Sequence, residues 1–226
     1  IQTDTVVPLL DAAERTGTAV LLGLPTRDPE TAEAYNSAVF LDEALAIYHK
    51  RHLLPFGEYV PFRRWFGPLL DLFGAPLGDF TPGRNPVLFQ LAGQGLAPFI
   101  CYEITRAVAV RDVVAGAGIL VNLSNDAWFG DSIGPHQHYQ MARMRALEFG
   151  RPLLRSTNTG ITAAVDHRGV EQGRLPQFVV DALVVSVVPR SGLTVYARLG
   201  NGLVGWPVAL VGLLVSAWRF TRRPGE

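Results

Sequence analysis

The chain has a single cysteine, Cys101, and no excess of charge of either sign. One cysteine cannot form an internal disulfide, so cysteine usage does not indicate a redox compartment. Lysine plus arginine and aspartate plus glutamate number 20 each, which gives a formal net charge of zero at pH 7. Nucleic acids select basic surfaces that neutralise their phosphates, so this balance argues against a nucleic-acid partner. The composition therefore favours a small molecule, a lipid or another protein as the partner.

The beginning of the chain lacks two further features. No positively charged segment followed by an apolar stretch is present, so no signal peptide is recognisable. Position 1 is isoleucine rather than an initiating methionine. We therefore expect the chain to be part of a longer protein.

The five histidines share no sequence pattern with Cys101. His136 and His138 are two residues apart, and two helical residues at this spacing do not converge on one metal ion. No acidic or thiol partner stands beside them. We therefore expect neither a metal site nor a cofactor.

A run of 20 residues without a charged side chain, 199–218, stands near the end of the chain. About 20 apolar residues span a hydrocarbon core of ~30 Å, so we predict a transmembrane helix here. The alternative is a buried core helix, which Asn201 and Pro207 favour, although membrane helices tolerate proline. Three arginines follow the run, so the positive-inside rule would place residues 219–226 in the cytoplasm and residues 1–198 on the outer side.

Helix-like and strand-like segments interleave through the rest of the chain. Apolar residues at helical spacing predict helices at 3–16, 105–115 and 136–149. Apolar runs between turn residues predict strands at 19–24, 35–41, 44–49, 87–91, 96–100, 119–123, 153–156, 161–165 and 179–187. We therefore expect one layered α/β domain with helices outside the sheets.

Residues 59–79 are unusually apolar for a connecting segment. Large apolar side chains recur there at helical spacing, namely Phe62, Trp65, Phe66, Leu69, Leu70 and Phe73. Such a stripe fits a helix face packed on the core. It equally fits an amphipathic lid that lies on a bilayer or covers an acyl chain.

Cys101 stands directly after a predicted strand and before a helix-like segment. Peptide N–H groups and the helix dipole at such a position favour the thiolate, which is the nucleophilic form. The same N–H groups can donate to the oxyanion that forms when a carbonyl is attacked. The alternative is that Cys101 is a small buried apolar residue without chemistry.

Three charged residues favour the chemical interpretation of Cys101. Lys50 ends a predicted strand, and a lysine in a desolvated pocket can stabilise a thiolate and an oxyanion together. Glu58 and Glu103 could orient the Lys50 ammonium. Each of these residues taken alone also fits a solvated surface charge.

Five sequence motifs together identify a resemblance. They lie at residues 48–61 (YHKRHLLPFGEYVP), 100–103 (ICYE), 122–130 (NLSNDAWFG), 140–148 (QMARMRALE) and 155–162 (RSTNTGIT). The chain resembles the carbon-nitrogen hydrolase (nitrilase) superfamily, and within it the apolipoprotein N-acyltransferases, bacterial inner-membrane enzymes of lipoprotein maturation. The motifs cover most of residues 15–170, and the set is specific although each motif alone would be weak.

The resemblance implies a domain organisation. Residues 1–198 would form the catalytic domain, an α-β-β-α sandwich that is truncated at its N-terminus. Residues 199–218 would be the final membrane helix of the family, and residues 219–226 a cytoplasmic tail. The parent protein would be a multi-pass protein of the bacterial inner membrane with its catalytic domain on the periplasmic side.

The resemblance also implies roles for individual residues. Cys101 matches the nucleophile of the Glu-Lys-Cys catalytic set and Lys50 matches its lysine. Glu58 and Glu103 match supporting acidic positions of the catalytic site. The substrate-binding positions implied in the same way are Tyr102, Trp128 and Asn125.

The implied reaction is an acyl transfer in two steps. Cys101 would take an acyl chain from a phospholipid such as phosphatidylethanolamine and form a thioester. The thioester would then pass the chain to the α-amine of the diacylglyceryl-cysteine of an apolipoprotein. Thioesters react readily with amines, and a covalent intermediate divides one difficult transfer into two easier ones.

One departure from the family pattern concerns the general base. In the family this base is a glutamate in a Pro-Glu motif after an early strand, which should precede the helix at 3–16. Pro29-Glu30 is no substitute, because it follows the strand at 19–24 in an expected hairpin loop. We therefore expect the chain alone to lack the base and the upstream membrane helices, and to be inactive.

Two other interpretations of the chain remain. A nitrilase-like amidase would use the same cysteine and lysine but transfer the acyl group to water. The apolar segments at 59–79 and 199–218 argue against it, because a soluble amidase has no reason to expose them. A non-catalytic membrane-anchored binding module is the other alternative, and the presence of both Cys101 and Lys50 argues against it.

Overall fold

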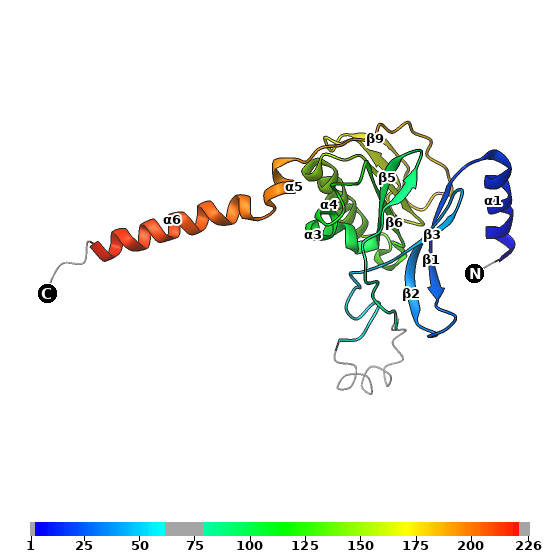
Figure 1. Ribbon diagram of the computed structural model, residues 1–226, viewed down its shortest axis with the longest axis horizontal. Coiled ribbons are helices and arrows are strands. Elements are labelled where there is room, and N and C mark those ends of the chain that lie inside the picture. The colour runs from blue at the N-terminus through cyan, green and yellow to red at the C-terminus, as the bar shows by residue number, and fades with distance from the viewer. Residues whose placement is uncertain (1–2, 62–78, 222–226) are drawn as a thin grey trace.

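The computed structural model describes residues 3–61 and 79–221 (Figure 1). Its helices are α1 (Thr3–Thr16), α3 (Ala107–Arg111), α4 (Gly134–Phe149), α5 (Val195–Leu199) and α6 (Gly202–Thr221), with 3-10 turns η1 (Cys101–Thr105) and η2 (Ala127–Phe129). Its strands are β1 (Val20–Arg27), β2 (Ala34–Leu41), β3 (Leu45–His49), β4 (Phe89–Leu91), β5 (Gln94–Ile100), β6 (Ile119–Ser124), β7 (Leu153–Thr157), β8 (Ala163–Val165) and β9 (Glu171–Arg174).

The strands form two sheets. β1, β2 and β3 make an antiparallel sheet, and the hairpin between β1 and β2 closes where Asp28 accepts hydrogen bonds from the N–H groups of Glu30 and Thr31. The second sheet has the order β4-β5-β6-β7-β8-β9, in which β5, β6 and β7 are parallel. Parallel strands are buried on both faces, which explains why β5 and the first half of β6 are almost wholly apolar.

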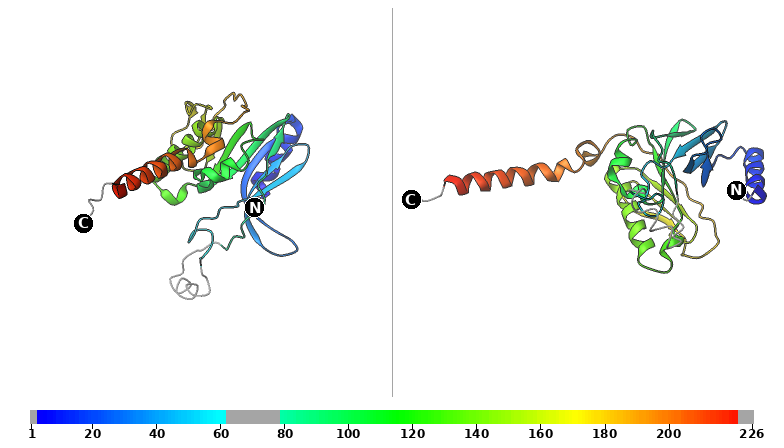
Figure 2. Two further views of the ribbon diagram at one scale, coloured as in Figure 1. Left: turned by 60° about the vertical axis from the view of Figure 1, so that its left-hand side comes forward. Right: turned by 90° about the horizontal axis from the view of Figure 1, so that it is seen from below.

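The two sheets pack face to face between outer helices. Side chains of β2 and β3, among them Ala38, Phe40 and Tyr48, meet side chains of the larger sheet in one core cluster. A second cluster lies between the other face of the larger sheet and helices α3, α4 and α5. Figures 1 and 2 show α1 on the outer side of the smaller sheet. The order of layers is therefore α-β-β-α, as predicted.

The carboxyl ends of the three parallel strands meet at one edge of the larger sheet. Ile100 of β5 is level with Leu123 of β6, which is level with Ser156 of β7. The residues that follow each strand therefore come together in space. Ligand sites in parallel sheets are typical of this edge, outside the carboxyl ends of the strands.

Gly95 allows β5 to take its place in the sheet. A Cβ at this position would lie 2.1 Å from the carbonyl oxygen of Gly116, and no side chain tolerates that distance from backbone. The strand that leads into Cys101 therefore packs closely on the segment after α3, and only glycine fits at the contact.

Arg151, which follows α4, joins this part of the chain to neighbouring loops through hydrogen bonds. Its guanidinium is buried and has no carboxylate partner among the residues that the structure covers. It donates instead to the backbone carbonyls of Val114, Ala117, Phe149, Gly150 and Gly192. A buried charge is tolerated when its donors are satisfied in this way, so Arg151 joins three loops through their backbones.

The uncharged run near the end of the chain forms α6, which projects away from the domain in Figure 1. Glycines, Pro207 and Ser216 interrupt its apolar side chains, and the described side chains between residues 205 and 216 are exposed. Within residues 3–61 and 79–221, no helix is long and apolar enough to cross a membrane. The predicted transmembrane helix at 199–218 is therefore not supported, nor is the cytoplasmic placement of 219–226 that depended on it. The alternative of a buried core helix is wrong.

Three other predictions differ from the structure. Residues 179–187 are not a strand, although half-buried Leu183 and Val185 alternate with exposed Val184 as a strand would require. The alternation reflects packing of one face, whereas a strand also needs a hydrogen-bonded neighbour. The helix predicted at 105–115 is the short α3, and the strand β9 was missed because its residues are polar. Most of the apolar segment 59–79 lies outside the described residues.

Candidate active site

Cys101 is the first residue of η1 and follows β5 without a linker. Its φ angle is +53°, in the left-handed region that non-glycine residues rarely adopt. Such a conformation costs about 1–3 kcal/mol and persists only where the surrounding structure enforces it. The thiol therefore stands on a sharp turn at the carboxyl edge of the larger sheet.

Glu103 joins the turn of Cys101 to the segment of Lys50. Its side chain is 1% exposed. One carboxylate oxygen accepts hydrogen bonds from the Tyr48 hydroxyl at 2.7 Å and from the N–H groups of Arg51 at 3.0 Å and His52 at 3.1 Å. The other oxygen accepts from the N–H of Ile100 at 3.2 Å. Four donors from both sides of the site therefore meet on one carboxylate.

Replacing Glu103 by glutamine should destabilise the fold by roughly 2–4 kcal/mol, because an amide NH₂ would then face at least one of these donors in a buried place. Tyr48→Phe removes one donor and leaves the carboxylate its other three, so a cost of about 1 kcal/mol is expected. Melting temperatures of both variants in the complete gene product measure the difference. Equal melting temperatures for Glu103→Gln and the wild type would contradict the role of Glu103 as a buried acceptor of these hydrogen bonds.

Lys50 and Glu58 form a buried ion pair. The Lys50 Nζ lies 2.5 Å from Glu58 Oε2, and the two side chains are 1% and 13% exposed. The backbone of Lys50 is fixed on both sides, since its N–H donates to Asn36 and its carbonyl accepts from Gly83. Among the residues that the structure describes, Glu58 is the only acceptor for Nζ. Two ammonium N–H groups therefore remain available for another partner.

Glu58 is engaged at both oxygens. Oε1 accepts from the Asn36 amide at 2.6 Å, and Oε2 accepts from the Leu54 N–H at 2.8 Å as well as from Lys50. The sequence-based prediction that Glu58 orients the Lys50 ammonium agrees with this contact. The same prediction for Glu103 is wrong, because the partners of Glu103 are the Tyr48 hydroxyl and backbone N–H groups near Lys50, not its ammonium.

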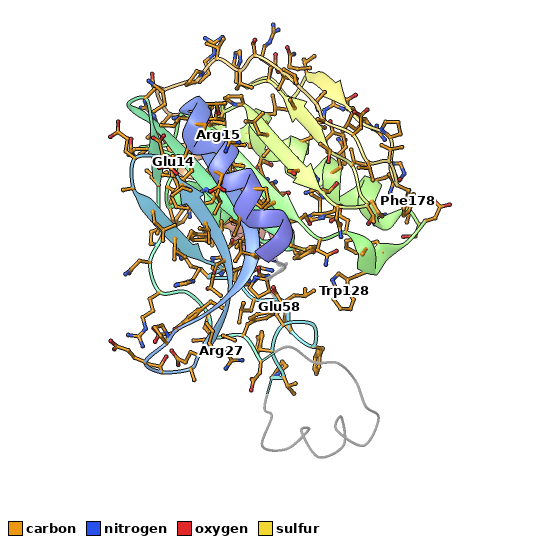
Figure 3. The ribbon with its side chains drawn as sticks, turned by 90° about the vertical axis from the view of Figure 1, so that its right-hand side faces the viewer. Glu14, Arg15, Arg27, Glu58, Trp128 and Phe178 are labelled. Atoms are coloured by element: carbon orange, nitrogen blue, oxygen red, sulfur yellow. The ribbon has the colours of Figure 1, made fainter. Side chains whose placement is uncertain are left out.

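The three predicted substrate-binding residues lie at the same edge of the sheet. Tyr102 is 43% exposed and Trp128 is 79% exposed. Figure 3 shows Trp128 projecting outward from the fold, as does Phe178. The side-chain Oδ1 of Asn125 accepts from the N–H of Ala127 and from the Asn158 amide, so this side chain also shapes its own loop.

Sequence analysis missed a buried polar network behind Cys101. Arg155 from β7 donates to Asp126 at 2.7 Å and also to the Asn122 amide oxygen. His138 from α4 places Nδ1 3.2 Å from Asp126 Oδ1 and 3.1 Å from the Arg155 guanidinium. These residues stand in the motifs at 122–130 and 155–162 or on a predicted helix. Their contacts cross 12 to 33 residues of the sequence, so spacing alone does not show that they work together.

Asp126 stays ionised in this network. Burial alone would raise its pKa, but its hydrogen bonds with His138 and Ser124 and the Arg155 charge outweigh it and lower the pKa to about 2. A depressed folded-state pKa contributes stability above the ordinary value of 3.8, and this stability is lost as pH falls toward 2.

Acidification from pH 5 to pH 2 should therefore cost the wild type about 2 kcal/mol through Asp126 alone. The Asp126→Asn variant lacks this titration, so its melting temperature should fall less over the same range, from a lower starting value. Thermal melting of both proteins across this pH range measures the difference. Parallel curves for the two proteins would exclude an ionised Asp126 as a source of stability.

Comparison with known proteins defines the class of the chain. Residues 1–192 match the family model of carbon-nitrogen hydrolases. The chain therefore belongs to the carbon-nitrogen hydrolase family.

Curated relatives are more specific. The chain is 40% identical to an apolipoprotein N-acyltransferase of Photobacterium profundum, over 98% of this chain and 45% of the relative. It is 44% identical to that of Methylococcus capsulatus, over 95% of this chain and 43% of the relative. The chain thus spans less than half the length of these relatives.

A solved structure supports the fold. A mutant of the amidase from Nesterenkonia sp. AN1, with the acetamide moiety of fluoroacetamide added covalently at its active-site cysteine, aligns with a TM-score of 0.56. The two chains are 23% identical, and the alignment covers 75% of this chain and 61% of the amidase. The nitrilase-like fold predicted from the sequence is thereby confirmed.

Proposed function

We propose that the chain forms the catalytic domain of an apolipoprotein N-acyltransferase. The observation that carries this choice is 40% identity to such an enzyme over 98% of the chain. The geometry supports the chemistry, because Cys101 stands on a strained turn and the buried Lys50 ammonium has N–H groups without a partner among residues 3–61 and 79–221. The relatives are about twice as long, so the proposal concerns the complete gene product.

In the first step, the Cys101 thiolate attacks the carbonyl carbon of an acyl ester in a phospholipid, such as phosphatidylethanolamine. A carbon–sulfur bond forms, and the ester oxygen leaves as the alcohol of a lysophospholipid after taking up the proton that the thiol lost. Lys50 stabilises the negative charge on sulfur and then on the carbonyl oxygen. The cysteine adduct of the Nesterenkonia amidase supports a nucleophilic thiol in this fold.

In the second step, the α-amine of a diacylglyceryl-cysteine attacks the thioester. The new carbon–nitrogen bond gives an amide, the carbon–sulfur bond breaks, and the nitrogen loses a proton. Cys101 returns to its starting state. Exposed Tyr102 and Trp128 at the edge of the site offer apolar surface to the acyl chains.

The substrates determine where the protein acts. Both donor and acceptor are lipids anchored in a bilayer, so the site must reach a membrane surface. We place the complete protein at the bacterial inner membrane with this domain on its outer, periplasmic side.

Amide hydrolysis is the competing activity, because the fold is shared with an amidase. The test is to supply the purified complete gene product with phosphatidylethanolamine and a synthetic diacylglyceryl-cysteine peptide, and in parallel with acetamide or butyramide. The proposal expects a triacylated peptide and a lysophospholipid in equal amounts, with little ammonia from the amides. Ammonia release without triacylated peptide would favour the amidase. Neither product from folded protein would favour a binding module.

A further inference from the structure

The backbone carbonyl oxygen of Cys101 is hydrogen-bonded by two side chains. The His138 Nε2 lies 3.1 Å from this oxygen, and the Asn122 Nδ2 lies 3.2 Å from it. A carbonyl oxygen only accepts hydrogen bonds, so both nitrogens must donate. Two buried side chains from different elements, α4 and β6, therefore fix the backbone of the nucleophile.

The His138 ring is fixed in turn by its surroundings. It is 2% exposed, and its centroid lies 6.1 Å from the ring centroids of both Tyr102 and Phe129. Its Nδ1 faces Asp126 and Arg155. A neutral ring accepts there from Arg155, and a charged ring donates there to Asp126. Nε2 carries a proton in both states, so the donor to Cys101 does not depend on the charge of the ring.

The direction of this carbonyl decides what faces the substrate. The peptide between Cys101 and Tyr102 is planar and trans, so its N–H points opposite to its carbonyl. With the carbonyl directed toward His138 and Asn122, the Tyr102 N–H is directed away from them. Tyr102 is in the first turn of η1, where N–H groups have no partner within the helix. The hydrogen bonds to the Cys101 carbonyl thus fix both the backbone conformation of Cys101 and the direction of the Tyr102 N–H.

The geometry points to His138 as a positioning residue for the acyl transfer: together with Asn122 it keeps Cys101 in its left-handed conformation and directs the Tyr102 N–H toward the reacting carbonyl. This inference rests on the proposed role of Cys101 as the nucleophile. His138 touches neither substrate nor sulfur in this role, and takes no proton in the reaction.

Two variants of His138 separate positioning from packing. In His138→Gln, the amide nitrogen reaches the place of Nε2 and can still donate to the Cys101 carbonyl. In His138→Asn, the shorter side chain reaches only the place of Nδ1, so that donor is lost. Both variants lose the ring near Tyr102 and Phe129, and both should melt at a similarly lowered temperature.

The experiment measures kcat and KM for acyl transfer by the complete gene product, with Cys101→Ala alongside. His138→Asn should lose about 10- to 100-fold in kcat with KM within twofold, since small misplacements of a nucleophile cost this much. His138→Gln should stay within about threefold of wild type and keep the shape of its pH–rate profile. Equal kcat values for the two variants, whether both low or both normal, would overturn the inference, as would loss of one limb of the profile in His138→Gln.

Asn122→Asp keeps the test decisive if His138→Asn does not fold. It removes the amide that donates to the carbonyls of both Phe99 and Cys101, and it retains an acceptor for Arg155. A fall in kcat without a rise in KM supports the inference, and a normal kcat overturns it. Transfer activity in Cys101→Ala would instead refute Cys101 as the nucleophile, and absence of transfer by folded wild-type protein would refute the proposed function, so these failures are distinguishable.

Discussion

Replacing Cys101 by alanine should lower acyl transfer by at least about 10⁴-fold, because the covalent intermediate can no longer form. The substitution removes one sulfur atom from a side chain that makes no hydrogen bond in the part of the chain described by the structure. The melting temperature should therefore change little. Transfer is measured as triacylated peptide formed from phosphatidylethanolamine and a diacylglyceryl-cysteine peptide.

Cys101→Gly serves as the matched control for this result. Glycine adopts the left-handed conformation without cost, so this variant relieves strain and should fold at least as well as Cys101→Ala. Both variants should be equally inactive. Residual transfer above 1% of wild type, roughly 100 times more than expected, would mean that another group forms the covalent bond.

Loss of the Lys50 ammonium is expected to have the second largest effect. Lys50→Met keeps most of the side-chain volume but removes the charge that we propose stabilises the thiolate and the oxyanion. Removing one such electrostatic contact typically costs about 10²–10³-fold in kcat. The variant also leaves the Glu58 carboxylate without its cation, at a cost of about 3–5 kcal/mol in stability.

The double variant Lys50→Met/Glu58→Gln separates the two effects. A glutamine at position 58 removes the unpaired charge and can still accept from the Asn36 amide, so much of the lost stability should return. Transfer should remain low, because the ammonium is still absent. Recovery of both stability and transfer would show that Lys50 is needed only for the fold.

The layered fold was predictable from the sequence because its strongest signals are local. The apolar runs of β5 and β6 and the helical spacing of 3–16 identify elements whose bounds differ little from the predicted ones. Pairing depends on neighbours, and so the apolar run at 179–187 predicts a strand that the structure does not form. The run without charge at 199–218 predicts a membrane helix, but within residues 3–61 and 79–221 no helix is long and apolar enough to cross a membrane.

The sequence predicted the residue types of the candidate site better than the hydrogen bonds between them. The prediction that Glu58 contacts the Lys50 ammonium agrees with the ion pair between them, whereas the role of Cys101 as the nucleophile stays a prediction. Contacts across many residues could not be read from spacing. Glu103 reaches back to the Tyr48 hydroxyl and two backbone N–H groups, and His138 contacts Cys101 across 37 residues.

The most direct test of the central claim is to detect the acyl-enzyme itself. The complete gene product is incubated, without an acceptor, with phosphatidylethanolamine that carries an isotope-labelled acyl chain. The mass of the proteolytic peptide that contains Cys101 is then measured by mass spectrometry. A mass increase of one labelled acyl chain on Cys101, removed by hydroxylamine and absent from Cys101→Ala, is the predicted result. An unmodified Cys101 peptide from protein with a cooperative melting transition would contradict the acyltransferase mechanism.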